Sequence, residues 1–175
     1  MVKLSSCWGF TLVETLVTAA IVAVLVSLVV LAWPRAVAAS ASAKCMSNMR
    51  SLQVSLASYV QDRGHWPQVP PEIDVSASEN DAAYEDWWLE ELKDYGGTEK
   101  VWQCPTIKRM VMSKNPDGRP KISYTPTPFD ELAFTPYRWA KQPWLIEIGN
   151  MHGHGAFICF PDGSIKTMGD IIGPE

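Results

Sequence analysis

A long apolar run near the N-terminus constrains this chain more than any other feature. After a short polar leader, apolar residues dominate from Phe10 to Trp33, and Glu14 is the one charged side chain among them. A helix of about 24 residues is roughly 36 Å long, which is enough to cross a hydrocarbon layer ~30 Å thick. Because a carboxylate inside such a layer costs roughly 2.5–3.5 kcal/mol on insertion scales, we expect Glu14 to have a partner or a role.

The rest of the composition bounds the kind of protein. A chain of 175 residues suits one membrane segment followed by one modest soluble domain. The net charge is −4 and no basic block is present, so we expect no nucleic-acid partner. The sequence contains no glycine-rich phosphate loop, no zinc-type cysteine spacing and no nucleophile elbow, so we expect no enzymatic activity and no cofactor.

Beyond Arg35 the pattern becomes one-sided. Apolar residues recur there at steps of three and four, which places them on one helical face: Cys45, Met49, Leu52, Leu56 and Tyr59. Gly64 followed by Pro67 is a natural stop. The sequence therefore predicts one helix from Phe10 to about Arg63, apolar all round in its first half and amphipathic in its second.

Shorter elements are expected in the remainder. A second helix is predicted over 81–95, a strand or loop over 101–105 and turns over 107–121. Strands are predicted over 122–125 and 144–148, and a β-hairpin over 156–168 with its turn at Pro161-Asp162-Gly163. A long helix packed on a small antiparallel sheet is an α+β fold.

The residues Gly9-Phe10-Thr11-Leu12-Val13-Glu14 resemble the class III signal of type IV pilins and type II secretion pseudopilins. The resemblance implies that a prepilin peptidase/methyltransferase cuts after Gly9 and N-methylates Phe10. It also implies that Glu14 pairs with the terminal amine of a neighbouring pilin-like subunit. Such a pair reduces the cost of holding both charges in an apolar layer.

The same resemblance implies an organisation and a location. The expected parts are a leader (1–9), a transmembrane and assembly helix (10–33), its amphipathic continuation (34–66) and a globular α+β domain with a pilin-like fold (67–175). The expected protein is a single-pass subunit of the bacterial inner membrane. Its C-terminal domain lies in the periplasm or in an extracellular filament.

Other interpretations of the N-terminus remain open. A secretory signal peptide is possible, with Lys3 at its start and Ala39-Ser40-Ala41 or Ala41-Ser42-Ala43 as the cleavage site, although the apolar run exceeds the usual h-region. A plain signal anchor and a lipoprotein attached at Cys7 are the others. The anchor favours an alternative function: a membrane-anchored, extracytoplasmic binding module that recognises glycan or a secreted protein.

A second resemblance lies near the C-terminus. His152, nine further residues and then Asp162-Gly163 resemble the H-X9-DG segment of many prepilin-type proteins. Beyond Cys7 the chain has three cysteines, which predicts one disulfide and one spare thiol. Cys45 and Cys104 resemble paired positions of that group, so the resemblance implies a Cys45–Cys104 bridge and leaves Cys159 as a buried thiol.

The histidines of this segment raise the question of a metal. His152, His154 and Asp162 are of metal-ligating type. Ordinary hairpin and turn chemistry explains the same residues, since Asp162-Gly163 is a hairpin turn and Gly153 and Gly155 make the His region a turn. We therefore expect no metal there.

Charge is distributed in two blocks in the middle of the chain. Ten acidic residues against Lys93 alone occupy 72–99, and six basic residues against Asp117 alone occupy 100–121. These blocks are expected to be solvated faces, with complementary surfaces between neighbouring subunits as the alternative.

Overall fold

The helix α1 (Leu12–Arg63) runs for 52 residues, as the apolar and amphipathic patterns predict. The computed structural model describes residues 11–74, 81–114, 121–132, 134–153 and 155–173. The chain forms two compact units, Met1–Ala39 and Ser40–Glu175. Helix α1 continues through Pro34 and contributes to both units.

The part of α1 in the first unit exposes its apolar side chains on every face. Large side chains from Leu12 to Trp33 are about half exposed or more, and Trp33 is 66% exposed. The segment is long and apolar enough to cross a membrane, with a mean hydropathy of 2.8, and a signal sequence near the N-terminus has the same properties. An all-round apolar helix needs an apolar surrounding to hide this surface from water.

In the second unit α1 is buried along the predicted face. Cys45, Met49, Leu52 and Leu56 are fully buried, and Tyr59 is 3% exposed. The three- and four-residue spacing of these side chains confirms the predicted face and makes this half of α1 the spine of the core.

The sheet is antiparallel and has four short strands, β1 (Tyr124–Pro126), β2 (Leu145–Glu147), β3 (Phe157–Cys159) and β4 (Ile165–Thr167). Their order is β1-β2-β3-β4, with Tyr124 opposite Glu147 and Leu145 opposite Cys159. The predicted hairpin is confirmed, since β3 and β4 pair through the turn that Asp162 and Gly163 form.

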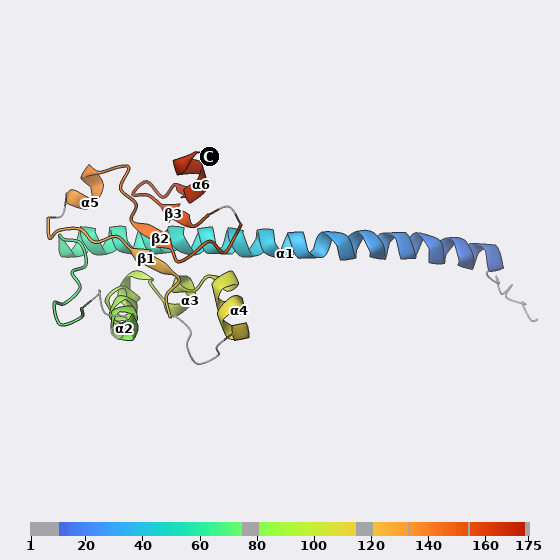
Figure 1. Cartoon of the computed structure of the whole chain (residues 1–175), viewed down its shortest axis with the longest axis horizontal. Helices are drawn as coiled ribbons and strands as arrows, with labels where there is room; N and C mark the ends of the chain where they lie inside the picture. Colours follow the sequence, from blue (N-terminus) through green and yellow to red (C-terminus); the bar gives the residue numbers. More distant parts are fainter. Residues whose placement is uncertain (1–10, 75–80, 115–120, 133, 154, 174–175) are drawn as a thin grey trace, which may run out of the picture. The chain divides into compact units, whose positions relative to one another are not determined.

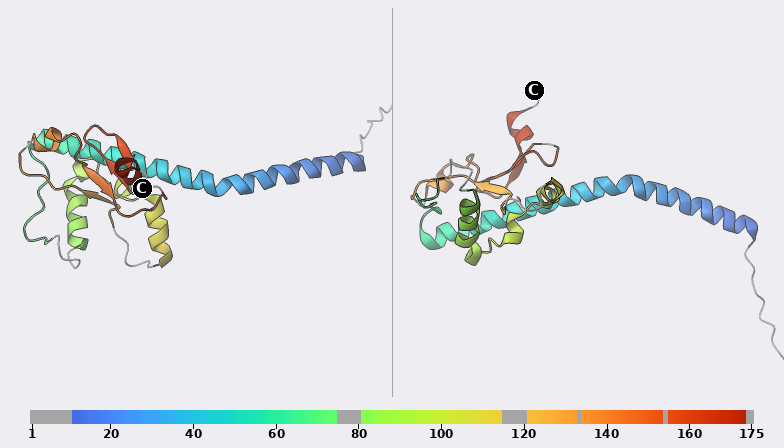
Figure 2. Two further views of the ribbon diagram at one scale, coloured as in Figure 1. Left: turned by 45° about the horizontal axis from the view of Figure 1, so that its top comes forward. Right: turned by 60° about the horizontal axis from the view of Figure 1, so that its bottom comes forward.

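Within the described residues, six short helical segments accompany the sheet and α1. They are α2 (Asp81–Glu91), the 3-10 turn η2 (Lys93–Tyr95), α3 (Glu99–Trp102), α4 (Pro105–Lys114), α5 (Thr135–Arg138) and α6 (Met168–Ile172). Figures 1 and 2 place α6 at the β4 end of the sheet and α2 near the C-terminal end of α1. The helix on a small antiparallel sheet confirms the α+β class and is a pilin-like architecture.

At three places the local structure differs in detail from the expectation. Of the strand or loop expected at 101–105, residues 101–102 instead end α3, where Trp102 is fully buried and its Nε1 donates to the carbonyl of Gly97, and only 103–104 lie outside the helices. Where turns were expected from residue 107, the structure has helix α4 up to Lys114, since Pro105 opens α4 at a position that suits proline, and 115–120 lie outside the described residues. The helix expected over 81–95 ends at Glu91 and tightens into η2.

Tryptophan dominates the core of the second unit. Of eight tryptophans in the chain, Trp66, Trp88, Trp102 and Trp144 are at most 2% exposed. Trp66 meets Trp144 edge to face with ring centroids 5.2 Å apart, and Trp144 Nε1 donates to the carbonyl of Pro136. The strands are only three residues long and contribute few side chains, so these large aromatic rings fill much of the core.

Candidate functional site

The charged residue of the apolar segment, Glu14, lies in the first turn of α1. Its Oε2 accepts hydrogen bonds from the Thr11 backbone N–H at 2.8 Å and from Thr11 Oγ1 at 2.9 Å. The Glu14 N–H donates in return to Thr11 Oγ1 at 3.2 Å. This reciprocal pattern is a capping box, so Glu14 satisfies donors at the start of its own helix.

The capping box adds a second role for Glu14 that the sequence signal Thr11-x-x-Glu14 could have indicated. The carboxylate of Glu14 therefore has hydrogen-bond partners at the start of its own helix. A test of assembly must therefore separate the negative charge of Glu14 from its capping function. The expected cleavage and methylation residues, Gly9 and Phe10, lie outside the described residues, as do Lys3 and Cys7.

A disulfide joins α1 to the start of α4. Cys45 and Cys104 are bonded with their Cα atoms 5.1 Å apart, and both are fully buried. The neighbouring Asn48 donates from Nδ2 to the carbonyl of Gln103 at 2.9 Å. The Cys104 backbone N–H donates to Ser123 Oγ at 2.9 Å. These bonds fasten the loop before α4 to both α1 and β1.

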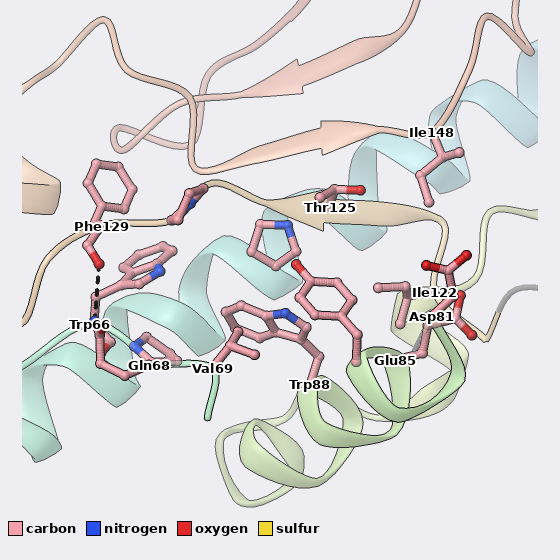
Figure 3. A pocket seen from close by; sticks show the side chains of 14 residues that line it. Trp66, Gln68, Val69, Asp81, Glu85, Trp88, Ile122, Thr125, Phe129 and Ile148 are labelled. Atoms are coloured by element: carbon pink, nitrogen blue, oxygen red, sulfur yellow. Dashed lines mark hydrogen bonds between the residues drawn. The ribbon is translucent and has the colours of Figure 1, made fainter. Parts of the chain in front are cut away.

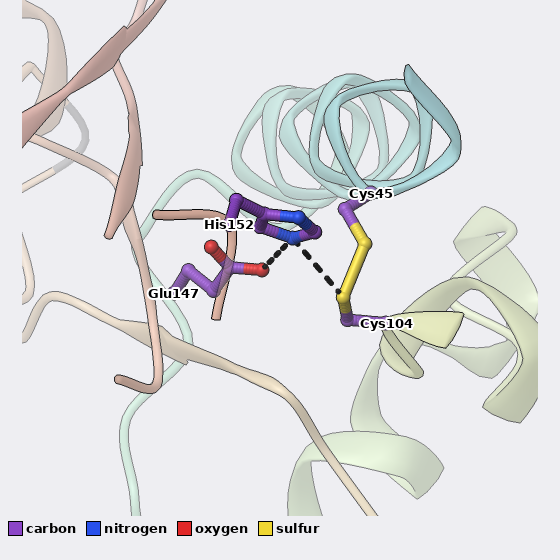
Figure 4. Close-up of side chains that lie close together, drawn as sticks. All are labelled: Cys45, Cys104, Glu147 and His152. Atoms are coloured by element: carbon purple, nitrogen blue, oxygen red, sulfur yellow. Dashed lines mark hydrogen bonds and ion pairs between the residues drawn. A yellow bond between two sulfur atoms is a disulfide. The ribbon is translucent and has the colours of Figure 1, made fainter. Parts of the chain in front are cut away.

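Next to the disulfide lies a buried contact between an imidazole and a carboxyl group, those of His152 and Glu147 (Figure 4). His152 Nε2 is 3.1 Å from Glu147 Oε1 and 3.5 Å from Cys104 Sγ. The His152 and Glu147 side chains are 4% and 0% exposed. The remaining polar atoms are also bonded: His152 Nδ1 lies 2.9 Å from Ser42 Oγ, and Glu147 Oε2 accepts from the Phe157 N–H at 3.2 Å.

The fold explains why these side chains meet. Leu145 and Glu147 are two residues apart in β2, so both point to the core face of the sheet. His152 follows in a loop bracketed by Gly149 and Gly153, both with φ of +81°. That left-handed backbone is unfavourable for other residues and turns the loop back beneath the strands. The ring of His152 then stacks on Phe157 of β3 with centroids 4.7 Å apart.

Burial sets the electrostatics of Glu147. Loss of water raises the pKa of its carboxyl above the usual range, and the Phe157 N–H and His152 oppose this rise. An unpaired carboxylate at this depth would be strongly unfavourable, whereas one with a histidine and a backbone donor is compensated. Glu147 was not singled out from the sequence, although a lone acid within a buried apolar strand is a signal for such a partner.

Of the three metal candidates of the sequence, the two that the structure describes, His152 and Asp162, do not share a cluster. His152 joins Cys45, Cys104 and Glu147 in one cluster of ligand-type atoms. Asp162 is exposed and instead accepts from the Ser164 N–H at 2.9 Å within the hairpin turn, which lowers the pKa of its carboxyl. His154 lies outside the described residues. The arrangement around His152 was missed because its partners come from four separate parts of the chain.

Cys159 is the remaining cysteine of the second unit. It is fully buried in β3, and burial raises the pKa of its thiol to about 12. The thiolate, which is the nucleophilic form, is therefore scarce at neutral pH. This environment is that of a core residue.

An aromatic pocket of about 680 Å³ lies between the segment after α1, helix α2 and strand β1 (Figure 3). Its described lining is mostly apolar, and Trp66, Trp88 and Phe129 contribute rings to it. Trp66 Nε1 is buried and has no hydrogen-bond partner within the described part of the chain. Asp81 and Glu85 place carboxylates at one end, and Glu85 is occupied by the Lys121 backbone N–H at 2.8 Å.

The two charge blocks meet within the chain. Lys121 Nζ contacts both carboxylate oxygens of Asp86, at 2.5 and 2.6 Å. This pair is largely exposed, so it contributes little to stability, but it links one residue of each charge block within the same chain.

Comparisons of the chain with protein-family models, with curated proteins and with solved structures find no match. The functional argument therefore rests on the architecture and on the residues described above.

Proposed function

We propose that the chain is a structural subunit of a type IV pilus-like or type II secretion pseudopilus filament, inserted once in the bacterial inner membrane and processed by a prepilin peptidase. The observation that supports the proposal most directly is α1 itself. Its first half is apolar on every face with one acid at the start, and its second half is built into the core of an α+β domain. One helix thus links a segment that needs an apolar surrounding to a folded domain that does not.

Assembly would bury the exposed apolar surface of the first half against equivalent helices or lipid. In such a layer the amine of a new N-terminus at Phe10 and the carboxylate of a neighbouring Glu14 would compensate each other. Removing one member of a buried ion pair costs roughly 3–5 kcal/mol, because the other charge stays unpaired. That loss, repeated at every subunit contact, is enough to exclude a variant from a filament.

Two substitutions at Glu14 separate charge from capping. Glu14→Gln keeps a side chain that serves at this position of a capping box, whereas Glu14→Ala removes both capping and charge. We expect both variants to be inserted and processed, and neither to crosslink into filaments with the efficiency of wild type. If Glu14→Gln assembles normally and only Glu14→Ala fails, capping explains the residue and charge pairing is wrong.

The processing step has its own test. We expect mass spectrometry of membrane-extracted protein to find N-methylated Phe10 as the first residue. Gly9→Val should block cleavage, because a β-branched side chain replaces hydrogen at the scissile residue. A mature chain that begins at Ser42 or Lys44, after Ala41 or Ala43, would instead identify a secretory signal peptide.

The pocket favours one alternative, an anchored binding module. Its mostly apolar lining, to which Trp66, Trp88 and Phe129 contribute rings, is typical of a ligand site, such as one for glycan or a segment of a secreted protein. Normal assembly of both Glu14 variants, together with saturable glycan binding that Phe129→Ala abolishes, would make this the better account.

A further inference from the structure

Four side chains of metal-ligating type converge between α1, α4 and the sheet: Cys45, Cys104, Glu147 and His152 (Figure 4). Their ligand atoms all lie within 4.8 Å of one another. While the two sulfurs are bonded to each other, only Glu147 and His152 offer ligands, since a cysteine binds metal as its thiolate. We propose that the reduced chain binds one zinc ion at these four residues, so that disulfide and metal exclude each other.

The spacing of the atoms fits tetrahedral zinc. Bond lengths of about 2.0 Å to nitrogen and oxygen and about 2.3 Å to sulfur set the edges of the tetrahedron. The nitrogen–oxygen edge is then about 3.3 Å and the nitrogen–sulfur edge about 3.5 Å. In the structure His152 Nε2 lies 3.1 Å from Glu147 Oε1 and 3.5 Å from Cys104 Sγ. Two edges are therefore close to the required length before any metal enters.

Hydrogen bonds to neighbouring groups also orient the ligand side chains. Ser42 Oγ, 2.9 Å from His152 Nδ1, can accept a hydrogen bond from Nδ1–H, and in that tautomer the lone pair of Nε2 faces the cluster. The Phe157 N–H holds Glu147 Oε2 and leaves Oε1 facing the same point. Metal sites in proteins use such outer partners to fix ligand direction. The mixed nitrogen, oxygen and sulfur set suits zinc rather than magnesium or calcium, which prefer oxygen alone.

The exchange between the two states balances. Zinc binding to the dithiol releases two protons, one from each cysteine. When a small-molecule disulfide then oxidises the site, the Cys45–Cys104 bond forms and two electrons pass to the oxidant. The oxidant takes up two protons and leaves as two thiols, and the zinc ion is released. This site lies wholly in the second unit, so the inference stands independently of the filament proposal.

The test uses the full chain in detergent micelles with cobalt(II) as the spectroscopic probe. The chain is reduced with a phosphine in the presence of chelator, the chelator is removed, and Co²⁺ is titrated in. We expect one equivalent to give the visible bands of a tetrahedral site and the near-ultraviolet band of cobalt–thiolate bonding, both removed by Zn²⁺. The oxidised chain should show no thiolate band.

Variants assign the site. Cys159→Ala should give the wild-type spectrum. Cys45→Ser should lose the cobalt–thiolate band intensity that two sulfur ligands give. His152→Ala should weaken Co²⁺ binding about tenfold or more. Thermal unfolding tests the site without any variant. Zn²⁺ should raise the Tm of the reduced wild type and leave the Tm of the oxidised wild type unchanged. Absence of a thiolate band in the reduced chain, its loss in Cys159→Ala, or wild-type binding by His152→Ala would overturn the proposal.

Discussion

Removing the Cys45–Cys104 bridge should lower the free energy of unfolding of the second unit by about 4 kcal/mol. The two cysteines are 59 positions apart, so the bridge closes a loop of about 60 residues in the unfolded chain. The chain-entropy relation for a loop of that length gives about 14 cal/mol/K, which is about 4 kcal/mol at 25 °C. Because domains of this size are stable by roughly 5–15 kcal/mol, the bridge supplies a large share of the total.

The assay is urea unfolding of a fragment that begins at residue 35, which we expect to fold alone because the second unit starts at Ser40 and contains the core. Fluorescence of the buried tryptophans reports the transition. The test protein is Cys45→Ala/Cys104→Ala, since a double substitution leaves no single buried thiol. Chelator is present throughout, so that no metal contributes.

Cys159→Ala is the matched control, because it also removes one buried sulfur but closes no loop. We expect it to cost much less than the double variant, about 1 kcal/mol for a small buried group. The double variant should also show a larger m-value, since its unfolded chain is more expanded. A loss of less than about 1 kcal/mol with an unchanged m-value would refute the argument from chain entropy.

Three further predictions concern the core. Tyr59→Phe should destabilise by about 1 kcal/mol, measured by urea unfolding, because it removes the 2.6 Å bond to Glu91 Oε1 and changes little else. Asn48→Ala should cost more, about 1–3 kcal/mol in the same assay, since it removes a side chain that is 2% exposed and leaves the half-buried Gln103 carbonyl without its 2.9 Å donor. Burial raises the pKa of the Cys159 thiol from 9.0 to about 12, so as the pH rises this thiol loses its proton in the unfolded chain before it does so in the folded chain. The free energy of unfolding should therefore fall between pH 9 and 12, by up to about 1.4 kcal/mol per pH unit. Cys159→Ala should flatten that part of the pH profile, and an identical slope in both proteins would contradict the burial argument.

The sequence by itself determined the elements whose pattern is local. Cys45 to Tyr59 repeat at the helical period and are buried along one face of α1. The turn at Asp162-Gly163 between two apolar runs predicted the β3–β4 hairpin. Each depends on residues a few positions apart, which adopt the same backbone geometry wherever the chain places them.

Tertiary structure decided the elements that lack such a pattern. Residues 99–102 form a helical turn because burial of Trp102 and its bond to Gly97 fix the backbone there, and neither is visible in a periodicity. The sequence resemblance implied the bridge from Cys45 to Cys104, and the structure joins the same two residues. The sequence resemblance did not indicate that this bridge would lie against His152.

The cluster around His152 shows the limit most clearly. Ser42 and Cys45 come from α1, Cys104 from the start of α4, and Glu147 from β2. Sequence patterns identify which residues share a face of one element, but they do not state which faces meet. Only packing of α1 on the sheet brings a carboxylate, an imidazole and two sulfurs to one buried point, because the free energy of that arrangement comes from contacts between distant segments.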